Sequence, residues 1–414
     1  MGQDRRSRDR GRTKFLCIVV IVIIILLQST TFGLANTAGD EEYVKDLYDS
    51  TYSQLDDIDF SQLDNILRDI EDPILSSNFY NLARSILEGN ADIDAGNILQ
   101  YALRASLSNF KSLLPFIFAI IVIAVVVRIL NIFSPNMFKN GVAEIINLVS
   151  VGVVIILLSS IVVKVSTSVF ATIHQMQNIT NILFPILLGL MATTGAVSSV
   201  SIYTPITTIL NVGVTNILSN FLYPIFVISF ALICIGAVSH RLKLDKFISF
   251  LASLFKSVVS FVFVIFSGVF VIKGISAGKY DSIGVYTTKF AVKNYVPIIG
   301  SYISEGFNYI MLSSVIVKNA VGLAGIIIIL VIVMSPAMYL LISKLVIQLT
   351  ASVVDIVGGK DISNLLDKVA KIFAFPVAIL LGVAFMFVMS ISLVICTANL
   401  LYLLCLFWGR VNDK

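Results

Sequence analysis

A long stretch without formal charge is the feature that most restricts how this chain folds. Between Lys164 and Arg241 there is no aspartate, glutamate, lysine or arginine. Over all 414 residues, 57% are apolar and 13% are charged, whereas an ordinary soluble domain has about 25% charged residues. A water-soluble fold needs charge on its surface. The stretch therefore indicates that the solvent around it is the lipid bilayer.

Apolar segments long enough to cross a bilayer recur through most of the chain. A span needs about 20 predominantly apolar residues, and the predicted spans are 113–133, 142–163, 179–199, 203–222, 223–239, 249–272, 319–343 and 373–395. A last apolar tract continues to Trp408 and adds a ninth short segment or an interfacial hairpin. We predict an all-α, polytopic transmembrane helical bundle of about 7–9 spans, some of them re-entrant, over residues 109–414.

The first residues have the order of an export signal. Six basic residues within 5–14 precede the apolar run Phe15–Leu27, and Gly33 and Ala35 have the small-residue spacing of a cleavage site. The run of about 13 apolar residues is short for a span of ~20. We expect residues 1–35 to be a cleaved signal peptide, with an uncleaved anchor as the alternative.

The following segment, residues 36–108, is acidic and holds fifteen acidic residues against four basic ones, a net charge of −11. Ser61–Asp64 matches a capping box, Phe79–Leu87 carries a second apolar stripe that ends at Gly89, and a third helix from about Asp94 is expected to enter the membrane. We predict a small extracytoplasmic helical domain with a solvated acidic face. Its small core favours docking onto a partner.

The distribution of lysine and arginine predicts the topology of the first part of the chain. Arg128 and the basic loop from Arg241 to Lys246 fit cytoplasmic positions. Residues 273–318 carry five lysines, although the count of spans places them outside. Either 249–272 does not fully cross the membrane, or the loop that follows folds back into it; Pro297 and Gly300 interrupt its helical pattern.

A hydroxyl-rich segment at membrane depth is the first candidate functional feature. Its candidate residues are Thr193, Thr194, Gly195, Ser198, Ser199 and Pro205. Gly195 and Ser199 have the spacing that lets helices approach closely, and Pro205 frees a backbone carbonyl that hydroxyl groups help to satisfy. The segment is either a broken helix that lines a pathway or a site of tight helix packing.

Asp355 is the second candidate, because a carboxylate inside an apolar stretch is expensive and often functional. The turn Gly358–Asp361 follows it, so an interfacial position is the alternative. The remaining charges inside apolar segments are lysines whose amines we expect to reach the interface by snorkelling, namely Lys164, Lys256, Lys318 and Lys344.

No catalytic or cofactor-binding constellation occurs in the sequence. There is no nucleophile elbow, no Walker-type phosphate loop and no His-Glu-x-x-His motif. The two histidines are isolated and the four cysteines lie in apolar segments, so we expect no metal and no cofactor. The basic residues are scattered, which argues against a nucleic-acid partner. The sequence predicts a protein that is not an enzyme.

Three further stretches carry a recognisable pattern. They are Thr-Lys-Phe-Ala-Val-Lys-Asn-Tyr-Val-Pro-Ile-Ile-Gly at 288–300, Val-Lys-Asn-Ala-Val-Gly-Leu-Ala-Gly at 317–325, and Thr-Thr-Gly-Ala-Val-Ser-Ser at 193–199 followed by Tyr203-Thr-Pro205. These stretches, and the order of signal, external segment and polytopic body, resemble the stage III sporulation protein AE family of endospore-forming bacteria. The resemblance covers most of residues 40–398 and rests on structural rather than catalytic signatures.

The resemblance implies a membrane subunit of the secretion-like channel complex between mother cell and forespore, which supports forespore development and late forespore gene expression. It implies a place in the mother-cell membrane around the forespore, with the N-terminal domain in the intermembrane space. The implied partners are other stage III sporulation membrane proteins and a SpoIIQ-type forespore partner. We also expect contact with the lipid bilayer and a homo-oligomer.

The alternative is a secondary transporter or permease for a small solute. Such a protein needs a site near the bilayer midplane and usually an ion-coupling residue, for which Asp355 is the best candidate. The scarcity of intramembrane acidic residues counts against proton-coupled transport.

Overall fold

The computed structural model describes residues 41–68, 78–89, 95–137, 142–239, 242, 244–295 and 300–412. Within these ranges all regular elements are helices and none is a strand, which confirms the predicted all-α class. The expected signal peptide at 1–35 lies outside the described residues.

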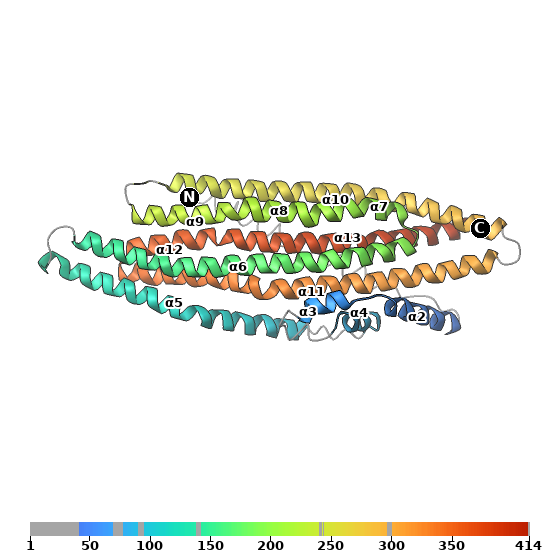
Figure 1. Cartoon of the computed structure of the whole chain (residues 1–414), viewed down its shortest axis with the longest axis horizontal. Coiled ribbons are helices and arrows are strands. Elements are labelled where there is room, and N and C mark those ends of the chain that lie inside the picture. The colour runs from blue at the N-terminus through green and yellow to red at the C-terminus, as the bar shows by residue number, and fades with distance from the viewer. Residues whose placement is uncertain are drawn as a thin grey trace.

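Five long helices run side by side along the molecule (Figure 1). They are α5 (Ala95–Met137), α6 (Val142–Thr193), α10 (Asp245–Tyr295), α11 (Gly300–Val357) and α13 (Ala374–Asn412). Among the described residues, six helical segments are long and apolar enough to cross a membrane. The chain is thus a multi-pass membrane protein. At 1.5 Å per residue, α11 is about 87 Å long, roughly three times the ~30 Å hydrocarbon core of a bilayer.

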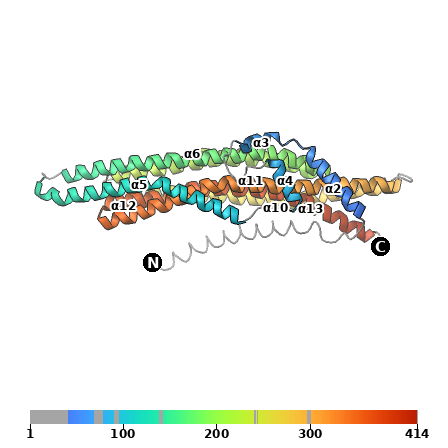
Figure 2. The same ribbon diagram turned by 90° about the horizontal axis from the view of Figure 1, so that it is seen from below.

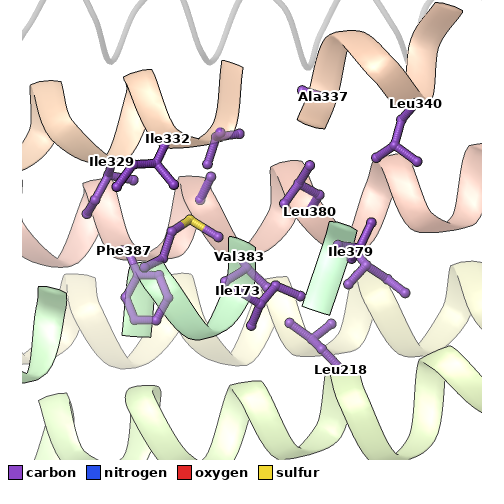
Figure 3. Packing of buried hydrophobic residues seen from close by; sticks show 14 of the residues in the cluster. Ile173, Leu218, Ile329, Ile332, Ala337, Leu340, Ile379, Leu380, Val383 and Phe387 are labelled. Atoms are coloured by element: carbon purple, nitrogen blue, oxygen red, sulfur yellow. The ribbon is translucent and has the colours of Figure 1, made fainter. Parts of the chain in front are cut away.

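Helix α11 lies at the centre of the bundle, where it packs against α5, α6, α10, α13 and the short helix α12 (Lys360–Ile372). The core between these helices is aliphatic and aromatic. Figure 3 shows side chains from α6, the π-helix η2 (Leu218–Leu222), α11 and α13 meeting there. Among them are Ile173, Leu218, Ile329, Ile332, Leu340, Leu380, Val383 and Phe387. Since each of these residues is at least nine-tenths buried, their packing holds the long helices together.

Two predicted spans, 142–163 and 179–199, are wrong as separate elements. Helix α6 continues through the supposed turn from Val142 to Thr193. Between Gly152 and Pro185 the sequence has no glycine or proline to end a helix. The ammonium of Lys164, expected outside the membrane, lies 5.0 Å from the centre of the Tyr339 ring. One lysine in an otherwise apolar helix therefore does not mark a turn.

The predicted boundary between 203–222 and 223–239 is also not a turn. Instead, α7 (Val197–Thr208), the π-helix η1 (Ile209–Val214), α8 (Thr215–Ile217), the π-helix η2 (Leu218–Leu222) and α9 (Tyr223–Val238) follow one another without a break. Pro224 lies at the start of α9, directly after η2. The wider π-turn separates the proline ring from the carbonyl four residues earlier, with which it clashes in an α-helix.

The lysine-rich stretch 273–318, expected to be a loop or a re-entrant segment, is largely helical. Helix α10 continues to Tyr295 and α11 begins at Gly300. Pro297, where an interruption was predicted, lies outside the described residues, and Gly300 is the first residue of α11. Helices α10 and α11 run antiparallel to each other (Figure 1).

The N-terminal helices α2 (Glu41–Asp56), α3 (Ser61–Arg68) and α4 (Phe79–Leu87) lie along one side of the bundle (Figure 2). The predicted capping box at 61–64 is wrong. Ser61 donates its N–H and hydroxyl to Asp59 at 2.9 and 2.5 Å, which lowers the pKa of that carboxyl. Asp64 instead accepts the Phe79 N–H at 2.7 Å and caps α4. Helix α4 ends before Gly89, as predicted, where φ is +68°.

Candidate functional site

Buried polar contacts join four helices close to the end of α6. Three links form this set, which we call the polar clamp: Asp281 with Ser198 and Ser199, Tyr203 with Thr397, and Lys318 with the backbone of α13. The links connect α7, α10, α11 and α13 inside a mainly apolar bundle. Buried polar groups of this kind fix the mutual positions of helices, since each leaves a costly unpaired atom when its partner moves.

The chain reverses direction between α6 and α7 at residues 194–196. Gly195 has φ of +82°, in the left-handed region that favours glycine. The hydroxyls of Thr193 and Thr194 donate to the carbonyls of Leu190 and Met191, each at 2.7 Å. They thereby add a partner to carbonyls in the last turn of α6. The Met191 carbonyl also accepts the N–H of Ala196 at 3.3 Å.

The start of α7 is capped by Asp281, a residue of α10 that is only 3% exposed. Its two carboxylate oxygens accept the N–H groups of Ser198 and Ser199 at 2.8 and 2.9 Å, and the Ser199 hydroxyl donates to it as well. The first N–H groups of a helix lack intrahelical partners and carry a partial positive charge. A carboxylate at this end therefore both accepts their hydrogen bonds and interacts favourably with the helix dipole. Asp281 thus fastens the α6–α7 reversal to α10.

Asp281 was not among the residues singled out from the sequence. The available signal was its position as one of two acidic residues, with Glu305, among five lysines in 273–318. Nothing in that pattern pairs it with a segment about eighty residues earlier.

The second link holds α7 against α13. The Tyr203 hydroxyl and the Thr397 hydroxyl are 2.8 Å apart, and both side chains are buried. Pro205 lies exposed on the same helix. The neighbouring hydroxyls of Ser201 and Thr204 donate to the carbonyls of Val197 and Val200 within α7. These hydroxyls therefore hydrogen-bond to carbonyls of their own helix.

Lys318 forms the third link, and its predicted snorkelling is wrong. The side chain is completely buried, and its ammonium donates to the carbonyls of Ile395 at 2.7 Å and Val394 at 3.3 Å. Among the described residues no carboxylate lies within ion-pair distance of this ammonium. Burying an ammonium without a counter-charge costs free energy, because the charge loses its hydration. Among the groups of the polar clamp, Lys318 therefore carries the largest cost of burial.

The face of α11 that carries Lys318 also carries Gly322 and Gly325, which lie four and seven residues further on. A Cβ atom at Gly322 would lie 2.5 Å from Cδ1 of Ile395, and one at Gly325 would collide with the end of the Leu183 side chain. The absence of side chains here lets α13 and α6 approach α11 closely. The stretch 317–325 is therefore the seam that joins three helices.

Asp355 lies apart from the polar clamp, in the last turn of α11. Its side chain is exposed, and its carbonyl accepts the N–H of Gly358 in the turn to α12. The site residues picked from the sequence thus fall into two places. Thr193, Thr194, Gly195, Ser198 and Ser199 gather at the α6–α7 reversal, with Pro205 further along α7, whereas Asp355 is at another end of the bundle.

The N-terminal helices dock one turn before Lys318 on α11. The Gln54 amide donates to the Ser313 hydroxyl at 2.7 Å and accepts from the Ser314 hydroxyl at 2.8 Å. Ser50 adds a contact to Ser313 at 3.2 Å. The small acidic domain therefore packs on the chain's own bundle, next to the polar clamp.

Within the described residues, no three His, Cys, Asp or Glu side chains gather as metal ligands would.

Comparisons with known proteins agree on one family. The family model described as stage III sporulation protein AE matches residues 77–398, a range that contains the entire polar clamp. The chain is 25% identical to the stage III sporulation protein AE of Bacillus subtilis (strain 168) over 303 residues, which is 73% of this chain and 75% of that protein. No solved structure matches the chain.

Proposed function

This chain belongs to the stage III sporulation protein AE family and so has a role in sporulation, and from this premise we propose that it is a membrane subunit of the mother cell–forespore channel complex. In this proposal it sits in the mother-cell membrane around the forespore, with its N-terminal domain in the intermembrane space. Its partners there are other stage III sporulation membrane proteins and a SpoIIQ-type forespore protein.

The observation that carries the proposal is the length of the bundle. Helix α5 is the first span after the exported domain, and its uncharged residues 112–127 rise about 24 Å, close to the depth of a bilayer. Arg128, at the end of this stretch, packs against Gly358 just after α11. Helices α5 and α11 run in the same direction (Figure 1). Because α11 is about 87 Å long, it is longer than the bilayer is deep, and in this proposal part of it projects from the membrane on the side of the N-terminal domain.

Such an extension suits a protein that works between two membranes. A small-solute carrier keeps its working parts within the bilayer, near the midplane. Here the polar clamp and the docked N-terminal helices belong to the projecting part, because Ser313 and Lys318 lie about forty residues from the membrane end of α11 at Val357. The projecting part supplies the surface on which other subunits of the complex assemble.

Deletion of the gene in the organism of origin tests the proposal. We expect heat-resistant spores to fall by orders of magnitude and a late forespore reporter gene to stay silent, with both restored by the full-length chain. Pull-down of the tagged chain from sporulating cells should recover the other stage III membrane proteins. Normal sporulation of the deletion strain would end the proposal.

The transporter alternative finds less support. Asp355, its ion-coupling candidate, is exposed in the last turn of α11, far from the middle of the bundle. Replacing Asp355 by asparagine should abolish solute uptake in vesicles if the alternative holds, and leave sporulation unchanged if the subunit proposal holds.

A further inference from the structure

Three lysines without an acidic partner lie on neighbouring helices of the bundle. Lys111 of α5 and Lys164 of α6 are exposed, and Lys344 of α11 is half-buried. We call these three residues the lysine rim. Within the described residues, no carboxylate lies at ion-pair distance from their ammonium groups. Helix α5 contains no acidic residue, and those of α6 and α11 lie eleven or more residues from the rim lysine of the same helix.

Contacts between the helices place the lysine rim at one level. Arg128 of α5 packs against the turn that directly follows α11, and the two helices run in the same direction (Figure 1). Lys111 lies seventeen residues before Arg128, which brings it to the level of residues 339–344 of α11. The ammonium of Lys164 reaches the same level from α6, since it lies 5.0 Å from the centre of the Tyr339 ring. The lysine rim therefore occupies a rise of about 8 Å along α11.

The exposed surface of α6 changes its chemistry at the lysine rim. Before Lys164, large apolar side chains are exposed along the helix, namely Ile145, Leu148, Val149, Val153, Ile156 and Val163. From Lys164 to Thr193 the helix exposes no large apolar side chain, and its exposed positions carry small or polar residues such as Thr167, His174 and Asn178. The first surface suits lipid chains and the second suits water. This change indicates that the hydrocarbon ends near Lys164.

Uncharged segments of two helices give the matching depth. Helix α5 has no charged residue between Lys111 and Arg128, a rise of about 26 Å, and α6 has none between Glu144 and Lys164, a rise of about 30 Å. Both values agree with a hydrocarbon core of ~30 Å. The lysine rim thus lies at one edge of the core, on the side where the N-terminal helices dock at Ser313. Lysine side chains at such an edge extend their ammonium groups among the headgroups.

We propose that the lysine rim binds the phosphates of anionic phospholipids in the leaflet on the side of the N-terminal domain. These phosphates supply the negative charge that the three helices lack at this level, and clustered basic residues at a membrane surface attract anionic lipids. The buried ring of Tyr339 beneath Lys164 adds an aromatic group at the level of the headgroups, where such residues are common. The proposal deepens the proposed function, on which the naming of the leaflet rests, because it sets the depth from which the bundle projects.

Spin labels on α6 test where the hydrocarbon ends. All four native cysteines are replaced by serine, and single labels are attached at Ile156→Cys, eight residues before Lys164, or at His174→Cys, ten residues after it. In liposomes of phosphatidylcholine and phosphatidylglycerol, power saturation measures collisions of each label with oxygen and with a water-soluble nickel complex. We expect oxygen to dominate at residue 156 and nickel at residue 174. A label at residue 174 that is as accessible from lipid as the one at residue 156 would overturn the proposal.

Native mass spectrometry of the purified full-length chain tests the lipid itself. We expect phosphatidylglycerol to bind in preference to neutral phosphatidylcholine, and a triple variant with glutamine at the lysine rim to bind phosphatidylglycerol at least about tenfold more weakly. The substitutions of this variant are Lys111→Gln, Lys164→Gln and Lys344→Gln. Arginine at the same three positions keeps the charges and should keep the affinity, which separates lost binding from lost folding.

The control for charge is a triple variant of α12, with Lys360→Gln, Lys368→Gln and Lys371→Gln. It loses the same number of charges, but two of its lysines are already paired with Asp245 and Asp367, so its affinity should stay within about twofold of the unchanged chain. Equal binding of the neutral lipid, or equal affinities of the two glutamine variants, would overturn the lysine rim as the site. Neither experiment measures sporulation, so failure here and failure of the proposed function remain distinguishable.

Discussion

Asp281 shows how much one buried carboxylate contributes when it meets a helix terminus. It accepts two backbone N–H groups and one hydroxyl at the start of α7. Asparagine keeps one carbonyl oxygen and turns the other acceptor into a donor that faces an N–H group. We therefore expect Asp281→Asn to cost about 1–3 kcal/mol, seen as a lower unfolding temperature of the purified protein in detergent.

The matched control for this prediction is Asp355→Asn. Its carboxylate is exposed and lies in no described ion pair, so the change should stay within about 0.5 kcal/mol. Equal unfolding temperatures for the two variants would show that Asp281 does not hold the α6–α7 reversal.

Lys318 leads to the opposite expectation for stability. The carbonyls of Val394 and Ile395 lie in the middle of α13 and keep their helical partners without the ammonium. Replacing a buried ion by an apolar side chain of similar length is often neutral or stabilising. Lys318→Met should therefore unfold at the same temperature as the unchanged protein or at a higher one. Lys318→Glu should unfold at a lower temperature, because the carboxylate oxygens of the glutamate would face the carbonyl oxygens of α13.

Counts of heat-resistant spores separate stability from function in these variants. If the ammonium serves the channel, Lys318→Met gives a stable protein that fails to restore sporulation. A marked loss of stability in Lys318→Met would instead show that the ammonium stabilises the junction of α11 and α13.

At the scale of elements, the seam at 317–325 sets how closely helices pack. Gly322→Ala places a methyl group against Ile395, which is 4% exposed and has little room to move. Overpacking of this kind costs about 1–3 kcal/mol. We expect a lower unfolding temperature, partly restored by a second change, Ile395→Val, that removes the colliding methyl.

Gly152→Ala is the control for the seam. A Cβ atom at Gly152 meets no atom within 4 Å, and alanine favours a helix over glycine by up to ~1 kcal/mol. This variant should be neutral or slightly more stable. If Gly322→Ala behaved the same way, close approach of α11 and α13 would not depend on the glycine.

At the scale of the whole molecule, the continuity of α6 decides the shape. Leu148 and Asn178 are both exposed on this helix and lie thirty residues apart. In one straight helix spin labels at these positions are separated by about 45 Å. A hairpin that turned near Lys164 would bring them side by side. Pulsed electron–electron double resonance on the doubly labelled protein in liposomes distinguishes the straight helix from the hairpin. A short distance between the labels would show that 142–163 and 179–199 are separate spans after all.

The sequence by itself determined the properties that depend on local composition. The uncharged stretch after Lys164 predicted a membrane helical bundle, and the apolar stripe at Phe79–Leu87 predicted α4 together with its end at Gly89. Hydropathy and helix periodicity are properties of neighbouring residues, so they can be recognised without knowing what packs against them.

The tertiary structure alone decided which charged residues are buried and what they meet. Lys318 and Lys164 look alike in sequence, yet one is sealed between α11 and α13 and the other is exposed over an aromatic ring. Asp281 reaches a helix start 82 residues away along the chain. Burial and pairing depend on the helices that surround a side chain, and that arrangement results from the packing of the whole bundle rather than from any local pattern.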